Sequence, residues 1–187
     1  MTCFDVNGYA FDWGKGAIST IYRLCHHLDN LHSKSNQVGI AHRRRRNMRR
    51  AAARMRSRIR HLVDSLHFAL SKWLCENYRV ILIPKFEVQN MIRKGKRKIR
   101  SKTVRQMVTL SHYKFRTRLI NKAREYKHCN VIVVTEEYTS KTCGNCGNIH
   151  KKLGGKKQFK CPRCNTTMDR DYNGARNICL KYISNLI

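Results

Sequence analysis

Four cysteines in the last third of the chain stand at the spacing of a zinc ribbon. Cys143 and Cys146 form one Cys-x-x-Cys pair, and Cys161 and Cys164 form a second pair after fourteen intervening residues. Two such pairs can present four thiolates to one tetrahedral zinc ion, which leaves no position open for a substrate. A redox-active Cys-x-x-Cys is the alternative, but a second pair at ribbon spacing favours the metal. The sequence therefore predicts a structural zinc site.

The remaining cysteines lack this spacing, and we expect them to be buried free thiols. The chain opens on no secretory signal, so we expect an intracellular, reducing location, which is the nucleus if the host is eukaryotic. The five cysteines concerned are Cys3, Cys25, Cys75, Cys129 and Cys179.

The scarce carboxylates gather around the cysteines. The chain has eleven acidic residues, and four of them are Glu136, Glu137, Asp169 and Asp171. Glu136 follows an apolar run and Asp171 precedes a helical pattern, so a closed zinc insert would bring these two positions to one end of a sheet. Paired carboxylates beside a phosphodiester suggest Mg²⁺ ions. The alternatives are that Asp171 is a helix N-cap and that Glu137 or Asp169 pairs with a neighbouring base.

A formal charge of +29, from 40 Lys and Arg against 11 Asp and Glu, indicates a polyanionic partner. Nucleic acid suits this charge because neutralised phosphates release counterions. An anionic membrane is the competitor, but no apolar run approaches the roughly 18 residues that span a bilayer. Arginines crowd residues 43–60, and lysines lie between the two cysteine pairs: Lys151, Lys152, Lys156, Lys157 and Lys160. We expect the lysine cluster to contact phosphates.

The elements that must position these residues follow from hydrophobic periodicity. Short strands covered on both faces are expected where β-branched runs are continuous, and helices where apolar residues recur at i, i+3, i+4. The expected elements are a hairpin over 1–16, a helix from Ile18, a helix over about 43–74 with a basic first half, a strand at 80–83, a basic loop over 93–102, a helix over 104–126, a strand at 131–134 and a helix over 172–183 with Ala175, Ile178 and Tyr182 on one side. Alternating strands and helices predict an α/β architecture with a small metal-bound insert.

Two segments carry a family resemblance. Residues 138–147 read Tyr-Thr-Ser-Lys-Thr-Cys-Gly-Asn-Cys-Gly, and residues 169–178 read Asp-Arg-Asp-Tyr-Asn-Gly-Ala-Arg-Asn-Ile. They resemble the C-terminal part of TnpB, the transposon-encoded RNA-guided nuclease related to type V CRISPR effectors, and the similarity extends over nearly the whole chain. Trp13-Gly-Lys-Gly followed by Leu24-Cys, and Ile83-Pro-Lys-Phe86, look most like the eukaryotic and viral branch called Fanzor.

The resemblance implies an RNase H-like, RuvC-type nuclease domain over 1–140 with 168–187, and a zinc ribbon inserted over 141–167. Such domains use three acidic positions with Mg²⁺, and Asp171 matches the third. The second usually ends the strand matching 80–83, where this chain has Pro84-Lys85-Phe86. In the Fanzor-like branch a glutamate just before Tyr-Thr-Ser takes its place, which is Glu136 here. Glu87 and Glu137 are weaker candidates.

The family's first acidic position lies just before the strand matching Thr2–Asp5, and Asp5 and Asp12 fall in the wrong places on the hairpin to replace it. The region that holds guide RNA also has no counterpart here. We therefore expect an N-terminally truncated fragment with little or no cleavage of its own, derived from an RNA-guided, Mg²⁺-dependent DNA endonuclease that binds DNA and guide RNA. The alternatives are a non-catalytic zinc-ribbon nucleic-acid-binding protein and a pseudogene product that folds poorly.

Overall fold

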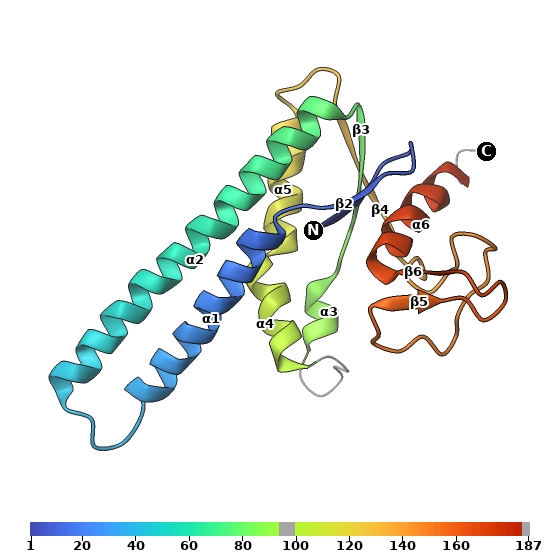
Figure 1. The fold of residues 1–187 in the computed structure, drawn as a ribbon. Coiled ribbons are helices and arrows are strands. Elements are labelled where there is room, and N and C mark those ends of the chain that lie inside the picture. Colours follow the sequence, from blue (N-terminus) through green and yellow to red (C-terminus); the bar gives the residue numbers. More distant parts are fainter. Residues whose placement is uncertain (94–99, 185–187) are drawn as a thin grey trace.

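The computed structural model describes residues 1–93 and 100–184 as a mixed α/β structure with a long helical arm (Figure 1). Its elements are β1 (Thr2–Phe4), β2 (Ala10–Asp12), α1 (Lys15–Ser35), α2 (His42–Asn77), β3 (Val80–Pro84), α3 (Val88–Ile92), α4 (Ser101–Leu110), α5 (His112–Ala123), β4 (Asn130–Val134), β5 (Gln158–Lys160), β6 (Thr167–Asp169) and α6 (Arg170–Ser184). Most of the basic loop expected over 93–102 lies outside the described residues.

The N-terminal hairpin is confirmed. β1 and β2 pair antiparallel, and the turn between them closes with Gly8 at a φ of 90°. The hairpin leads into α1 through Gly14, whose φ is 72° and where a Cβ would overlap the Leu66 side chain of α2. Trp13 and Trp73 bring their ring centroids to 5.3 Å, which attaches the hairpin to the end of α2. A glycine is therefore required where the chain turns against α2.

Helices α1 and α2 pack side by side as an antiparallel arm that extends from the body of the molecule (Figure 1). Apolar residues of both helices bury one another along the seam: Ile21, Cys25, Leu28, Ala52, Ile59 and Val63. The last part of α2 leaves this seam and enters the main core. The expected division of α2 into a basic first half and an apolar second half is confirmed. None of the helices among the described residues has the length and apolar character needed to cross a bilayer.

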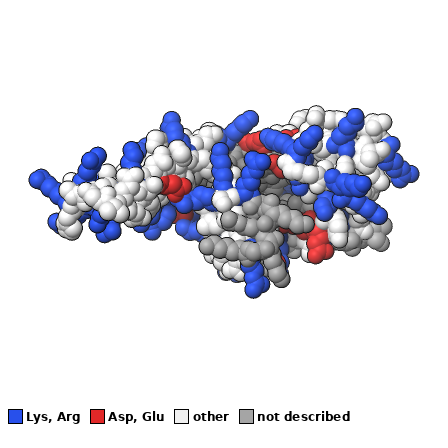
Figure 2. All heavy atoms as spheres, turned by 90° about the horizontal axis from the view of Figure 1, so that it is seen from below, with Lys and Arg blue, Asp and Glu red and all other residues white. Residues whose placement is uncertain are grey.

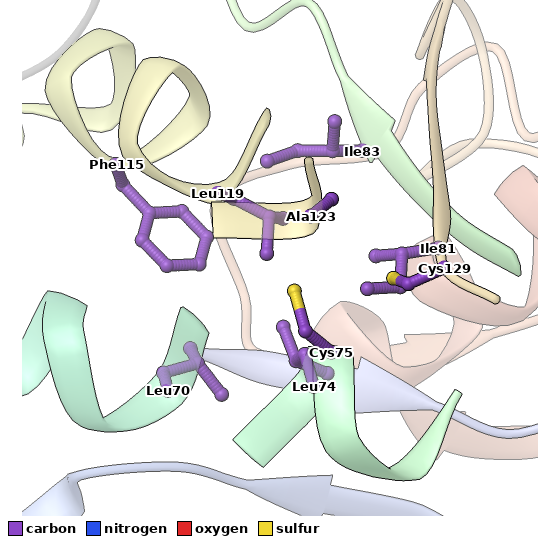
Figure 3. Packing of buried hydrophobic residues seen from close by; sticks show 9 residues of the cluster. All are labelled: Leu70, Leu74, Cys75, Ile81, Ile83, Phe115, Leu119, Ala123 and Cys129. Atoms are coloured by element: carbon purple, nitrogen blue, oxygen red, sulfur yellow. The ribbon is translucent and has the colours of Figure 1, made fainter. Parts of the chain in front are cut away.

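The main core lies between α2, α5 and the parallel pair β3–β4 (Figure 3). Ile81 and Ile83 of β3 point toward α5 and are buried, with Leu119 fully enclosed between the layers. The expectation that both strands are covered on both faces is wrong, because Val80 and Val133 are 52% and 45% exposed. Helices α2 and α5 cover one face of this two-stranded sheet, and α6 covers the other only in part.

The single helix expected over 104–126 is two helices. Ser111 adopts a left-handed conformation (φ 44°, ψ 64°) between α4 and α5 and turns the chain. Phe115, Leu119 and Ala123 of α5 remain in the core, whereas Val108 of α4 is 52% exposed. The apolar period of the sequence continues through Ser111, so the break leaves no signal in the pattern.

Candidate metal centre and carboxylate site

The four ribbon cysteines come together as predicted. Their Sγ atoms all lie within 4.8 Å of one another, with Cys143–Cys164 at 3.7 Å and Cys146–Cys161 at 3.6 Å. A tetrahedral zinc ion with Zn–S bonds of about 2.3 Å requires sulfur atoms about 3.8 Å apart. The thiol positions therefore fit one zinc ion with four sulfur ligands.

Neighbouring donors and packing hold the thiols in this arrangement. The Thr166 hydroxyl lies 3.1 Å from the Cys164 Sγ and lowers the pKa of that thiol to about 5, while the backbone N–H of Arg163 donates to the Cys161 Sγ at 3.4 Å. Phe159, from the antiparallel β5–β6 pair, is fully buried against the cysteines. The hydrogen bonds favour the thiolate form of Cys164 and Cys161 that a metal ligand needs, and the packing of Phe159 helps to orient the sulfur atoms.

The ribbon is joined to α6 by two asparagines. Asn173 donates to the Thr142 carbonyl at 2.7 Å, and its side-chain oxygen accepts the Gly144 N–H at 3.0 Å. One turn along α6, Asn177 donates to the carbonyls of Thr139 and Thr142 at 2.8 and 2.7 Å. Both asparagines are buried, so the helix supplies partners to loop carbonyls that water would otherwise have to satisfy.

Gly144 permits the close approach of these segments, whereas a Cβ at Gly174 would make only an ordinary contact. A Cβ on Gly144 would lie 3.0 Å from the Asn177 Oδ1 and 3.2 Å from the Asn173 Oδ1. Gly174 packs on Ser140, where a Cβ would be 3.8 Å from the Ser140 Cα. The Asn-Gly-Ala-Arg-Asn stretch of α6 is thus a docking face for the loop over 139–144. Sequence reasoning assigned neither asparagine a role, although two amides at i, i+4 flanking a helical glycine were the available signal.

Glu136 lies in the same loop, just past the end of β4. Its carbonyl accepts the N–H and hydroxyl of Thr139 at 3.2 and 2.8 Å, so the backbone is fixed one turn before the asparagine contacts. The side chain is half-buried, and burial raises the pKa of its carboxyl. Next to it, the Thr135 hydroxyl accepts a hydrogen bond from the Lys181 ammonium at 3.1 Å. The loop therefore runs antiparallel to α6 for about two turns.

Asp171 occupies the first turn of α6 and is exposed. The capping role considered for Asp171 belongs to Asp169, whose Oδ1 accepts the backbone N–H of Asp171 at 2.8 Å. Asp169 also lies 3.6 Å from the Lys157 ammonium, so the ion pairing considered for it is confirmed. The Asp171 carboxylate makes no hydrogen bond or ion pair with any other residue that the structure describes. It is therefore available to a ligand.

The weaker acidic candidates are engaged elsewhere or exposed. Glu87 lies 2.8 Å from the Lys85 ammonium, and Glu137 is exposed. On the hairpin, Asp5 accepts the Asn7 N–H and Asp12 accepts the Thr2 hydroxyl, at 2.8 and 2.7 Å. Within residues 1–93 and 100–184, the four cysteines are the one group of three or more metal-ligating side chains close enough to share an ion.

Positive charge covers both the arm and the body of the molecule (Figure 2). Within the described part of the chain, the arginines between residues 43 and 60 have no carboxylate partner, and the closest interactions of two of them are with the Gln37 carbonyl and His32. His42, Arg45, Arg46, Arg49, Arg50 and Ala53 line a groove of about 460 Å³ on the first turns of α2. The five lysines between the cysteine pairs are all exposed. These surfaces suit an extended polyanion.

Several known proteins are similar to this chain in sequence or in fold. The family model for the Cas12f1-like TNB domain matches residues 112–178, which include α5, β4 and the ribbon. Protein A625R of Paramecium bursaria Chlorella virus 1, whose name describes a transposase, is 37% identical over 187 residues, which is 98% of this chain and 41% of that protein. TnpB-like protein L79 of Acanthamoeba polyphaga mimivirus is 33% identical over 73% of this chain and 26% of its own length.

The chain belongs to the TnpB-like family. This TnpB-like chain spans about two fifths of the length of A625R and about a quarter of the mimivirus protein. A Cas12f1 endodeoxyribonuclease of Sulfoacidibacillus thermotolerans is 37% identical over 78 residues, which is 41% of this chain and 18% of that one. In the cryo-EM structure of a Cas12f1–sgRNA–target DNA complex, a chain that is 19% identical matches 91% of this one with a TM-score of 0.54 and is itself covered to 43%. That match shows a shared fold.

Proposed function

We propose that this chain forms the RuvC-type, RNase H-like face of a transposon-associated, RNA-guided DNA endonuclease, with Glu136 and Asp171 as Mg²⁺ ligands. The observation that carries the proposal is the pair of asparagines, Asn173 and Asn177, that ties the loop after β4 to the first turns of α6. That tie joins the two segments that carry the free carboxylates. In this proposal residues 1–140 and 168–187 form the nuclease domain, and residues 141–167 are the zinc-ribbon insert.

The two carboxylates fit magnesium by donor chemistry. Both are oxygen donors without a cationic partner among the described residues, and the half-buried Glu136 has its pKa raised by burial, which a bound cation would reverse. Carboxylate oxygens are the ligands that Mg²⁺ prefers, and two such ions about 4 Å apart can act together on one phosphodiester. When bound, such ions supply Lewis-acid chemistry to a phosphodiester.

DNA and guide RNA are the proposed partners. The Cas12f1 chain of matching fold is bound to sgRNA and target DNA in its own structure. Here the unpaired arginines of α2 and the exposed lysines of the ribbon supply the positive charge that a nucleic-acid backbone requires. The nine free cysteines agree with a reducing intracellular location.

A second candidate function is nucleic-acid binding without cleavage. It is favoured by the absence, among the described residues, of a third acidic or histidine ligand close enough to share an ion with Glu136 and Asp171. The arm and the ribbon require no catalytic metal in order to bind phosphates. Under this candidate the zinc ion and the asparagine tie keep the binding surface folded.

Manganese binding tests the carboxylate site directly. Electron paramagnetic resonance of Mn²⁺ titrated into the zinc-loaded chain is expected to show binding that Glu136→Gln and Asp171→Asn each weaken at least tenfold. Glu137→Gln is the matched control, because it removes the same charge one residue away, and it should bind as the wild type does. Equal Mn²⁺ binding by all four proteins would overturn the site and leave the second candidate. Mg²⁺-dependent nicking of DNA, measured in parallel, should be weak, and vigorous nicking that Asp171→Asn abolishes would show that the two carboxylates suffice.

A further inference from the structure

Tyr138 combines an exposed aromatic ring with a left-handed backbone conformation. Its side chain is 64% exposed, and its backbone has a φ of 62°, in the left-handed region that disfavours residues with a bulky side chain. It stands two residues after Glu136 and five before Cys143, in the loop that docks on α6. An exposed aromatic ring therefore stands two residues along the chain from a candidate metal ligand.

Hydrogen bonds fix this backbone conformation. The Tyr138 carbonyl accepts the N–H of Lys141, the N–H of Thr142 and the Thr142 hydroxyl, each at 2.9 Å. A left-handed conformation is unfavourable for a residue with a Cβ, a cost that glycine escapes and asparagine tolerates. In the ribbon, the residue with a φ of 56° is an asparagine, Asn165. Glycine or asparagine would therefore adopt this turn conformation at a lower conformational free energy than tyrosine does.

Packing does not offset the cost. The chain has one other aromatic residue at positive φ among the described residues, Phe86, which is half-buried and packs against His112 with ring centroids 4.6 Å apart and the ring planes at 55°. The Tyr138 ring has no stacked aromatic neighbour in the described part of the chain. Its one ring contact is with the Lys141 ammonium, 6.0 Å from the ring centroid. Most of the tyrosine surface therefore remains open to solvent.

We propose that Tyr138 and Lys141 form a nucleotide subsite in which an unpaired base of a single-stranded nucleic acid stacks on the tyrosine ring and an adjoining phosphate meets the lysine. Aromatic rings stack on any base, and an ammonium beside the ring adds a phosphate contact. A base inside a duplex already has both faces stacked, so the ligand is a displaced or melted strand. The subsite rests on the proposed function in one respect, which is that it would deliver this strand to Glu136 and Asp171.

Quenching of 2-aminopurine measures the stacking. A single-stranded oligodeoxynucleotide that carries 2-aminopurine is titrated with the zinc-loaded chain, and binding is followed in parallel by anisotropy of an end label. We expect quenching with the wild type and with Tyr138→Phe, and loss of quenching with about tenfold weaker binding for Tyr138→Asn. Tyr9→Ala is the matched control, because Tyr9 is 72% exposed on the hairpin, and it should leave both signals unchanged.

The asparagine variant separates stacking from folding. Since asparagine tolerates the left-handed conformation, Tyr138→Asn should melt at or above the wild-type temperature while it loses the stacked base. A lower melting temperature would mean that the ring supports the fold, and quenching that persists in Tyr138→Asn would place the base elsewhere; either result overturns the subsite. A wild-type complex that forms without quenching overturns the subsite alone. The absence of any complex would overturn the nucleic-acid interface as well.

Discussion

Asn177 and Thr139 are joined by a buried hydrogen bond of 2.8 Å from the asparagine amide to the threonine carbonyl. Thr139 lies in the loop that carries Glu136, three residues further along the chain, and Asn177 lies near the middle of α6. The same amide also reaches the Thr142 carbonyl at 2.7 Å, one residue before Cys143. Together with Asn173, Asn177 therefore connects the loop that carries Glu136, Tyr138 and Cys143 to α6, which carries Asp171.

Replacing Asn177 with alanine should lower the free energy of unfolding of the zinc-loaded chain by about 2 kcal/mol. The substitution removes the donor from the buried Thr139 carbonyl and one of two donors from the Thr142 carbonyl. Denaturant unfolding measures the change. Asn121→Ala, at an exposed position of α5, is the control and should stay within about 0.5 kcal/mol of the wild type. Equal stabilities for the two variants would show that the tie has no energetic role.

Adding a methyl group to Gly144 should disturb the packing of the ribbon loop on Asn173 and Asn177 of α6. A Cβ there would lie 3.0 Å from the Asn177 Oδ1 and 3.4 Å from the Arg176 Cδ, so Gly144→Ala should destabilise the chain by about 1–3 kcal/mol. Gly154→Ala is the matched control in the same ribbon, because a Cβ at Gly154 meets nothing within 4 Å. Thermal melts compare the two. If Gly154→Ala proved the more harmful, the close packing of the loop on α6 would be wrong.

Zinc removal should unfold the ribbon. Four thiolates at these distances predict one zinc ion per chain, and structural zinc contributes on the order of 10 kcal/mol to folding such inserts. Cys164→Ser is expected to lose the ion, measured by metal analysis of dialysed protein, and to expose the buried Phe159 to protease. Cys179→Ser, outside the cluster, should retain it. A chain that keeps its proteolytic resistance after complete zinc removal would falsify the structural role.

Local sequence patterns predicted most elements and the zinc ligands. Cysteine spacing reflects the geometry of the zinc ligands. Helical periodicity predicted α1 and α2 because each buries an apolar face, and it also predicted α6, whose apolar side is half-buried. The patterns failed where tertiary contacts decide. Ser111 breaks a periodic run, and the exposure of Val133 depends on how far α6 covers the sheet.

The polar face of α6 was the larger omission. The helical period placed Ala175, Ile178 and Tyr182 on one side, and these residues are half-buried. The fully buried residues are instead Asn173, Gly174 and Asn177. Buried amides look like surface residues in a hydrophobicity pattern. Their partners are backbone carbonyls of the loop over 139–142, and no sequence period reports such contacts.

The arginines of α2 should set the salt dependence of nucleic-acid binding. Changing Arg46, Arg49 and Arg50 to Gln removes three unpaired charges from the groove on the arm. The slope of log K against log salt for duplex DNA should fall by about 0.9 for each phosphate that the variant no longer neutralises. The control removes three lysines that already have carboxylate partners, Lys72, Lys85 and Lys122, and should change the slope less. Equal slopes would mean that net charge alone drives binding.

His67 makes the stability of the chain depend on pH. Its ring is 1% exposed against Phe115, with Asp64, His112 and Arg118 nearby, and burial followed by the Arg118 charge lowers its pKa from 6.5 to about 4. The folded state therefore favours the neutral ring. The stabilisation is complete above pH 6.5 and is lost as the pH falls toward 4, because the unfolded chain binds the proton first.

Between pH 7 and pH 5 this histidine should account for a loss of about 2 kcal/mol in the free energy of unfolding. His67→Leu should remove that part of the slope in denaturant unfolding across this range. The carboxylate of Asp64, whose pKa is lowered chiefly by its hydrogen bond from Lys114, titrates below this window and does not confuse the comparison. His27→Asn, at an exposed position of α1, should keep the wild-type slope. A slope unchanged in His67→Leu would assign the acid sensitivity to the zinc thiolates or to His112, because burial lowers the pKa of His112 as well.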